Sequence, residues 1–214
     1  NLNIENLIDQ TNDATKVIYI ASPNNPTGTY LSRDQLVKLM NSISKNIIVV
    51  IDGAYVEYVQ KDDYDKGFSL TDEYENIILT RTFSKTYGLA ALRVGWCYTS
   101  QKIADIINKI KPPFNTTSIS QSLAIKALED KEHIENSVKL NSEIKDWFEK
   151  ELKLLNIKTR QTEGNFTLIE TSEEEAEKIS NHLMNDGIII RRLNSYNLPN
   201  FLRISIGTKE EMNL

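Results

Sequence analysis

One short stretch of the chain combines residue types that can perform covalent chemistry. It is Thr82-Phe83-Ser84-Lys85, and Arg93 follows eight residues after the lysine. A lysine amine becomes nucleophilic when nearby cations or partial desolvation lower its pKa. Arginine with serine or threonine hydroxyls suits a phosphate, because the guanidinium fork matches the anion and the hydroxyls donate to its other oxygens. A reactive lysine beside a phosphate clamp indicates pyridoxal phosphate, although Lys85 taken alone fits an exposed strand-end lysine better.

Two upstream motifs supply partners for a pyridine ring that carries a phenolic oxygen. The first is Ser22-Pro23-Asn24-Asn25-Pro26-Thr27-Gly28, a turn-forming loop after an apolar run, from which Asn25 can donate an amide hydrogen. The second is Ile51-Asp52-Gly53-Ala54-Tyr55, which ends the apolar run Ile47 to Ile51. That run is typical of a strand buried on both faces. Ligands of open α/β sheets bind at the carboxyl ends of such strands, where Asp52 stands. Separately, each motif also fits a simple turn or a capping aspartate.

Together the motifs resemble the pyridoxal-phosphate aminotransferases of the aspartate aminotransferase fold, and most closely the histidinol-phosphate aminotransferases. The shared order is N-P-T-G, D-x-A-Y, S-K and then an arginine eight residues on. The resemblance extends to Gly187-Ile188-Ile189-Ile190-Arg191 and to the segment from Leu198 to Thr208, so it covers essentially the whole chain.

The resemblance implies a role for each residue around the ring. Lys85 would bond covalently to the cofactor and then move a proton during the reaction. Asp52 would pair with the ring nitrogen, and Asn25 and Tyr55 would bind the ring oxygen. Ala54 is similar to the small residue that packs against one face of the ring.

Phosphate and substrate contacts are implied in the same way. Thr82, Ser84 and Arg93 resemble the clamp on the cofactor phosphate, with threonine standing where serine is common. Arg203 matches the arginine that binds the substrate carboxylate in amino-acid transaminases. In histidinol-phosphate enzymes that arginine, with one in the place of Arg191, is similar to a clamp on the substrate phosphate.

The hydrophobic pattern predicts an α/β protein with a mostly parallel sheet and a smaller C-terminal α/β domain. Ser32-x-x-Gln35 is a capping-box start, and the helix that follows joins the strands at Val17 and Ile47 into a βαβ unit. Further strands are expected at 77–80, 94–98, 165–170, 187–192 and 201–206, with helices at 100–110 and 172–186. We expect a cofactor-binding portion over 1–130, a long connecting helix over 131–155 and the smaller domain over 156–214.

Composition favours a soluble cytoplasmic enzyme. The net charge is −5 over 214 residues, and no basic tract predicts nucleic-acid binding. No apolar run approaches the roughly 20 residues of a membrane-spanning helix, and no secretory signal begins the chain. The single cysteine, Cys97, fits a reducing compartment and is expected to pack in a strand. His133 and His182 lack neighbours at ligand spacing, so no metal site is expected.

The chain opens without methionine, and by resemblance we expect it to lack an N-terminal part and the extreme C-terminus of a longer, homodimeric enzyme. The expected reaction moves the amino group of histidinol phosphate to 2-oxoglutarate. Three alternatives remain open: a threonine-phosphate decarboxylase, an aromatic amino-acid aminotransferase, and a non-catalytic module of the same fold.

Overall fold

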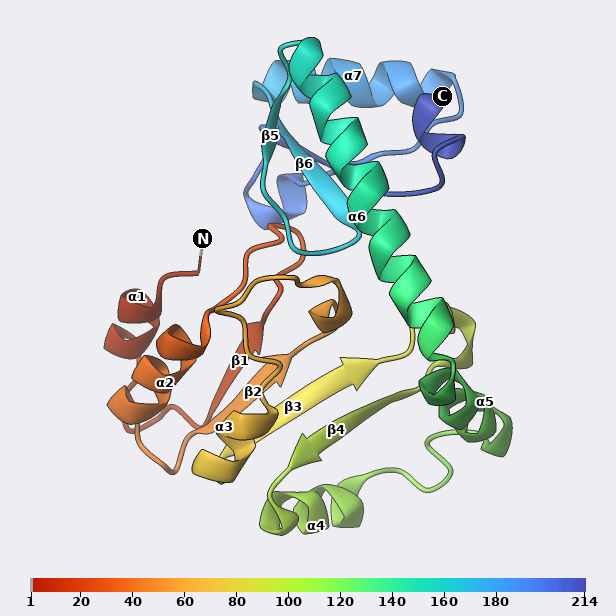
Figure 1. Ribbon diagram of the computed structural model, residues 1–214. Helices are drawn as coiled ribbons and strands as arrows, with labels where there is room; N and C mark the ends of the chain where they lie inside the picture. The colour runs from red at the N-terminus through yellow and green to blue at the C-terminus, as the bar shows by residue number, and fades with distance from the viewer. Residues whose placement is uncertain (1) are drawn as a thin grey trace. The chain divides into compact units, whose positions relative to one another are not determined.

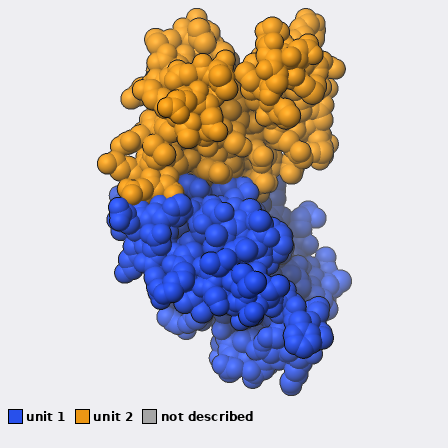
Figure 2. Space-filling model, turned by 90° about the vertical axis from the view of Figure 1, so that its right-hand side faces the viewer, with its two compact units in different colours: residues 1–23, 30–135 blue, residues 24–29, 136–214 orange. Residues whose placement is uncertain are grey.

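The computed structural model describes residues 2–214, which form two compact units (Figure 2). Unit 1 comprises the chain up to Pro23 together with Tyr30–Glu135. Unit 2 comprises Asn24–Thr29 and Asn136–Leu214. The short loop Asn24–Thr29 is therefore grouped with the second half of the chain. The division at 130 and 155 that the sequence suggests stays a prediction.

Unit 1 is built on a four-stranded sheet in the order β1 (Val17–Ala21), β2 (Ile48–Asp52), β3 (Ile77–Thr82) and β4 (Gly95–Thr99) (Figure 1). The first three strands are parallel, whereas β4 runs antiparallel to β3. The α/β class and the mostly parallel sheet predicted from the sequence are thus confirmed. Because β1, β2 and β3 are parallel, their carboxyl ends meet at one edge of the sheet.

One face of this sheet carries the core of unit 1. Alternate strand residues point to that face, and the helices α1 (Ile4–Asp9), α2 (Arg33–Ser42) and α3 (Phe68–Glu73) pack on it (Figure 1). Core strand residues are Ile18, Ile20, Val49, Ile51, Ile77 and Leu79. On the other face Ile48 and Val50 are only half-buried and Tyr19 is 63% exposed. The expectation that the strand at Ile47–Ile51 is buried on both faces is therefore wrong for the described chain, which covers one face.

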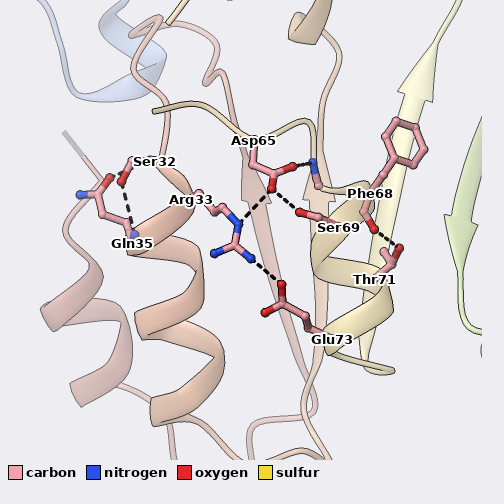
Figure 3. A network of polar contacts seen from close by, with 9 residues as sticks. Ser32, Arg33, Gln35, Asp65, Phe68, Ser69, Thr71 and Glu73 are labelled. Carbon is pink, nitrogen blue, oxygen red and sulfur yellow. Dashed lines mark hydrogen bonds and ion pairs between the residues drawn. The ribbon is translucent and has the colours of Figure 1, made fainter. Parts of the chain in front are cut away.

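The predicted capping box at the start of α2 is present (Figure 3). The Ser32 hydroxyl accepts from the backbone N–H of Gln35 at 3.3 Å, and the Gln35 side chain accepts from the Ser32 backbone N–H at 3.0 Å. The next residue, Arg33, forms ion pairs with Asp65 at 3.4 Å and with Glu73 of α3. These contacts tie the start of α2 to the segment that carries α3.

Three further helices follow β4: α4 (Gln101–Ile110), α5 (Ser118–Glu129) and α6 (Lys131–Leu154). Pro112 and Pro113 lie between α4 and α5, as the sequence predicted. The helix expected over 131–155 is observed as α6, and Asp130, which has a non-helical backbone, separates it from α5. Cys97 is exposed on β4, so its expected packing role is wrong. Its side chain points away from the buried face because strand residues alternate.

Unit 2 contains an antiparallel sheet in the order β5 (Lys158–Arg160), β6 (Phe166–Glu170), β8 (Phe201–Ser205) and β7 (Arg191–Arg192). The helix α7 (Glu173–Asn185) and the C-terminal half of α6 pack on it through a core that includes Leu152, Ile169, Ala176 and Leu202. Strand β7 has two residues, so the strand expected over 187–192 is mostly irregular. Four short 3₁₀ turns complete the described chain: Val56–Tyr58, Ala90–Leu92, Asn194–Tyr196 and Glu211–Asn213. Among residues 2–214 no helix is long and apolar enough to cross a membrane.

Candidate active site

Asp52 is the last residue of β2, at the edge of the sheet where the parallel strands end. Its carboxylate is half-buried, and its Oδ2 accepts a hydrogen bond of 2.8 Å from the hydroxyl of Tyr19 on the neighbouring strand β1. Burial raises the pKa of the Tyr19 phenol, and the hydrogen bond to Asp52 and the negative charge of Asp52 raise this pKa further. A hydrogen bond with Thr80 lowers it by a smaller amount. The phenol is therefore a stable hydrogen-bond donor to the carboxylate.

Lys85 lies in a tight turn between β3 and β4. Phe83 is buried with Val94 in a second core cluster. The next residue, Ser84, is half-buried, and Lys85 is exposed. The turn is closed by the backbone N–H of Gly88, which donates to the Lys85 carbonyl at 2.9 Å. The backbone N–H of Ser84 donates to the Thr82 hydroxyl at 3.1 Å. Burial of Phe83 thus anchors the turn and leaves the lysine amine accessible.

Arg93 reaches the same turn through the pairing of β3 with β4. Thr82 is paired with Gly95, and the Phe83 backbone N–H donates to the Val94 carbonyl at 3.3 Å, which places Arg93 directly before the segment paired with β3. Arg93 has a left-handed backbone with φ of 50°. That conformation costs about 1–2 kcal/mol for a residue with a Cβ. Its guanidinium donates to the Ala90 carbonyl at 2.7 Å.

Tyr55 and Ala54 follow Asp52 at the carboxyl end of β2. The Tyr55 side chain is buried, and the Lys85 ammonium nitrogen lies 5.2 Å from the centre of its ring. This distance is within the range of a cation–π contact. Ala54 is half-buried. Unit 1 therefore brings Asp52, Tyr55 and Lys85 to one edge of the sheet.

A buried arginine lies directly behind this edge. Arg81 of β3 is 6% exposed, and its guanidinium donates to the carbonyls of Thr80, at 2.7 Å, and of Lys66. An added Cβ on Gly53 would lie 2.8 Å from its Cζ, so only glycine leaves room for the guanidinium. Burial lowers the pKa of Arg81. Desolvation also raises the pKa of nearby Glu57, with Arg81 among the smaller opposing influences.

In unit 2 the loop that contains Asn25 is held by close packing. The Gly28 backbone has φ of 67°, and an added Cβ would lie 2.6 Å from the Thr162 Cα. The Gly28 N–H donates to the Asn24 carbonyl at 2.6 Å, and the Gly28 carbonyl accepts from the Glu163 backbone N–H at 2.7 Å. Glycine is required here both for the backbone angle and for the space. These contacts present Asn25, which is exposed.

Two arginines face each other on the sheet of unit 2. Arg191 on β7 is paired directly with Arg203 on β8, so their side chains share one face. The Arg203 guanidinium donates to the Asn25 side-chain oxygen and lies 5.3 Å from the centre of the Phe166 ring. Its Nε is buried and has no hydrogen-bond partner among the described residues. Like charges placed opposite each other are destabilising, and an anion would relieve this.

The predicted site residues are thus distributed over both units. Unit 1 holds Asp52, Ala54, Tyr55, Thr82, Ser84, Lys85 and Arg93, whereas unit 2 holds Asn25, Arg191 and Arg203. The role of Asn25 at a ring oxygen stays a prediction, and its observed partner is Arg203. Sequence reasoning missed Tyr19. The alternation of β1 exposes it on the face opposite the core, but the sequence alone did not set the register of β1 against β2.

Comparison with known proteins gives consistent matches. The family model for class I and II aminotransferases matches residues 1–214. The histidinol-phosphate aminotransferase of Pelagibacter ubique is 42% identical over 99% of this chain and 60% of its own length. That of Zymomonas mobilis is 40% identical over 98% of this chain and 58% of its own length. The chain therefore spans about 60% of the length of these curated relatives.

A solved structure agrees with the fold. The crystal structure of histidinol-phosphate aminotransferase from Sinorhizobium meliloti in complex with pyridoxal-5′-phosphate is similar with a TM-score of 0.90 and 27% sequence identity. The match covers 99% of this chain and 58% of that one. Since the family model matches the entire chain, a relative 42% identical covers 99% of it, and a solved structure shares its fold, the chain belongs to the class I and II aminotransferase family.

Proposed function

We propose that unit 1 binds pyridoxal phosphate at the carboxyl edge of its sheet. The donor set fits this group: a carboxylate for a protonated ring nitrogen, an accessible lysine, and two hydroxyls with a guanidinium for a phosphate. The observation that carries the proposal is that Lys85 stands above the Tyr55 ring, in the turn after β3 in which the Ser84 backbone N–H bonds to the Thr82 hydroxyl. Asn25 and Ala54 are proposed as further contacts to the ring.

The cofactor, when bound, supplies an electron sink that makes the substrate α-hydrogen acidic. In the proposed reaction Asp52 keeps a proton on the ring nitrogen by its negative charge. Lys85 would hold the cofactor through its amine and, when free, would act as the general base and acid that moves the substrate proton. Thr82, Ser84 and Arg93 hold the phosphate and thereby fix the position of the ring.

We further propose that the complete protein transfers the amino group of histidinol phosphate to 2-oxoglutarate. The names of the relatives from Pelagibacter ubique and Zymomonas mobilis support this substrate. The directly paired residues Arg191 and Arg203 support an anionic substrate group, because two arginines on one face of the sheet suit the doubly charged phosphate of such a substrate. The resemblance also leads us to propose a cytoplasmic homodimer, for which light scattering of the complete protein is the test.

The experiment that tests the cofactor site is borohydride reduction of the complete protein with pyridoxal phosphate, followed by peptide mapping. We expect the label on Lys85, and we expect Lys85→Ala to lose both the label and turnover. Lys102→Ala, which removes an exposed lysine at the start of α4, is the matched control and should retain both. Label spread over surface lysines, or normal turnover by Lys85→Ala, would contradict the proposal.

Substrate identity is tested separately by comparing amino donors. Histidinol phosphate should exchange its amino group with 2-oxoglutarate more efficiently than phenylalanine does. Release of carbon dioxide from threonine phosphate without amino-group exchange would instead identify a decarboxylase, and preference for phenylalanine would identify an aromatic amino-acid aminotransferase. Either result would refute the substrate while leaving the cofactor site intact.

A further inference from the structure

The Tyr19 hydroxyl ties the side chain of Asp52, the candidate partner of the ring nitrogen, to the neighbouring strand β1. The Tyr19 hydroxyl donates to Asp52 Oδ2 at 2.8 Å, across the pair β1 and β2. Register explains the reach: Ala21 is paired with Asp52, and Tyr19 lies two residues earlier on the same face of the sheet. The phenol therefore lies along the sheet toward the carboxylate, on the face opposite the core of unit 1.

A carboxylate at a strand end has two torsion angles that must be fixed before it can meet a ring nitrogen. A hydrogen bond to one oxygen removes much of this freedom and leaves the other oxygen for a second donor. Tyr19 provides such a bond from a rigid ring, and the ring itself is held on a strand rather than on a loop. The phenol does not compete as an anion, because burial and the Asp52 charge both raise its pKa.

We propose that Tyr19 is a positioning residue for the cofactor: it fixes the Asp52 carboxylate in the orientation that pairs with the ring nitrogen. The inference rests on the proposed cofactor site and adds a residue to it. Tyr19 acts through Asp52, so its hydroxyl is needed only while the carboxylate is present. Immobilising one side chain in advance corresponds to about three- to tenfold in affinity.

The test uses the complete protein with Tyr19→Phe, which keeps the ring and removes the hydroxyl. Tyr98→Phe is the matched control, because Tyr98 is a half-exposed tyrosine (46%) of the same sheet and packs against Phe68. The apoprotein is titrated with pyridoxal phosphate to obtain the Kd, and the ¹⁵N resonance of ring-labelled cofactor reports the proton on the ring nitrogen. Both measurements are independent of turnover.

We expect Tyr19→Phe to raise the cofactor Kd about three- to tenfold and to move the ¹⁵N resonance toward that of an unprotonated ring, with the KM for the amino donor within about twofold. Tyr98→Phe should change neither. In an Asp52→Ala background Tyr19→Phe should have no further effect, because the hydroxyl has lost its partner.

An unchanged or lower Kd, an unchanged ¹⁵N resonance, or an equal loss in the Asp52→Ala background would overturn the positioning role. These results differ from a failure of the proposed function. If Asp52→Ala binds the cofactor as tightly as the unaltered protein does, or if borohydride labels no residue in the turn at Lys85, the cofactor site itself is wrong, and the role of Tyr19 is refuted with it.

Discussion

Replacing Gly28 by alanine tests whether the Asn24–Thr29 loop is held by close backbone packing. Gly28 has φ of 67°, and the new methyl group would lie 2.6 Å from the Cα and 2.7 Å from the Cγ2 of Thr162. A Cα cannot be displaced by a side-chain rotation, so the loop or the segment that contains Thr162 must shift. Two hydrogen bonds of the Gly28 backbone, to Asn24 and from Glu163, oppose that shift.

The size of the effect follows from two contributions. The left-handed backbone costs about 1–2 kcal/mol once a Cβ is present. Inserting a methyl group into a packed site costs a further 1–3 kcal/mol or so. The expected loss of unfolding free energy for Gly28→Ala is therefore about 2–5 kcal/mol. Gly187 offers a control in the same unit, because its φ is 82° and an added Cβ would meet no atom within 4 Å.

The assay is urea unfolding of the complete protein with each glycine replaced by alanine. Gly187→Ala should lose only the backbone contribution of about 1–2 kcal/mol, so the difference between the two variants isolates the packing against Thr162. Gly28→Ala should also raise the cofactor Kd, since Asn25 belongs to the displaced loop. Equal urea midpoints for the two variants would refute the packing argument.

Three further predictions concern a helix cap, a buried carboxyl and the arginine pair. Ser32→Ala should lower the unfolding free energy by about 1 kcal/mol, because it removes the side-chain cap of α2. Ser100→Ala is the control and should lower it by less than about 0.5 kcal/mol, because the Ser100 side chain caps no backbone group of α4. Urea unfolding midpoints measure both effects. Because burial raises the pKa of Glu57, the folded state holds this proton more tightly, so its contribution to stability is present below pH 4.5 and is lost as the pH rises through the raised pKa. Glu57→Gln should therefore gain stability relative to the unaltered protein as the pH rises above 4.5, and equal pH profiles of the two proteins would contradict this. Arg203→Lys should raise the KM for the phosphorylated donor about tenfold with little change in the cofactor Kd, because lysine keeps the charge but lacks the forked guanidinium. Steady-state kinetics measure this, with Arg192→Lys as the control.

Most elements of the fold were predictable from local signals. Helix boundaries are marked by specific hydrogen-bonding patterns or steric rules. Examples are the Ser32 capping box, the Pro112-Pro113 break and the Ser172 cap before α7. The exceptions have short or mixed signals. Asp130 interrupts a continuous helical pattern through the backbone angles of one residue. Strand β7 has only two residues, which are the two that pair with β8.

The candidate site was predictable where neighbouring residues carry it and less so where distant strands do. Lys85 and Arg93 both belong to the connection between β3 and β4, so the sequence itself assigns them to one segment. The contact of Tyr19 with Asp52 depends on the register of two strands separated by a helix, and the contact of Arg203 with Asn25 joins residues from opposite ends of the chain. Register and long-range contacts follow from packing of the whole unit, which no local pattern encodes.

The residues with proposed roles are also those at which the chain departs from its own local rules. Arg93 adopts a left-handed backbone that glycine would accept at lower cost, and Arg191 stands opposite Arg203 where an opposite charge would be more stable. Arg203 in addition buries an Nε without a partner among the described residues. The departures at Arg191 and Arg203 concern guanidinium groups, and a bound anion would relieve both, whereas the cost at Arg93 lies in its backbone. The substrate phosphate that we propose for unit 2 would account for the unfavourable contacts of this arginine pair, whereas a purely structural module gains nothing from retaining them.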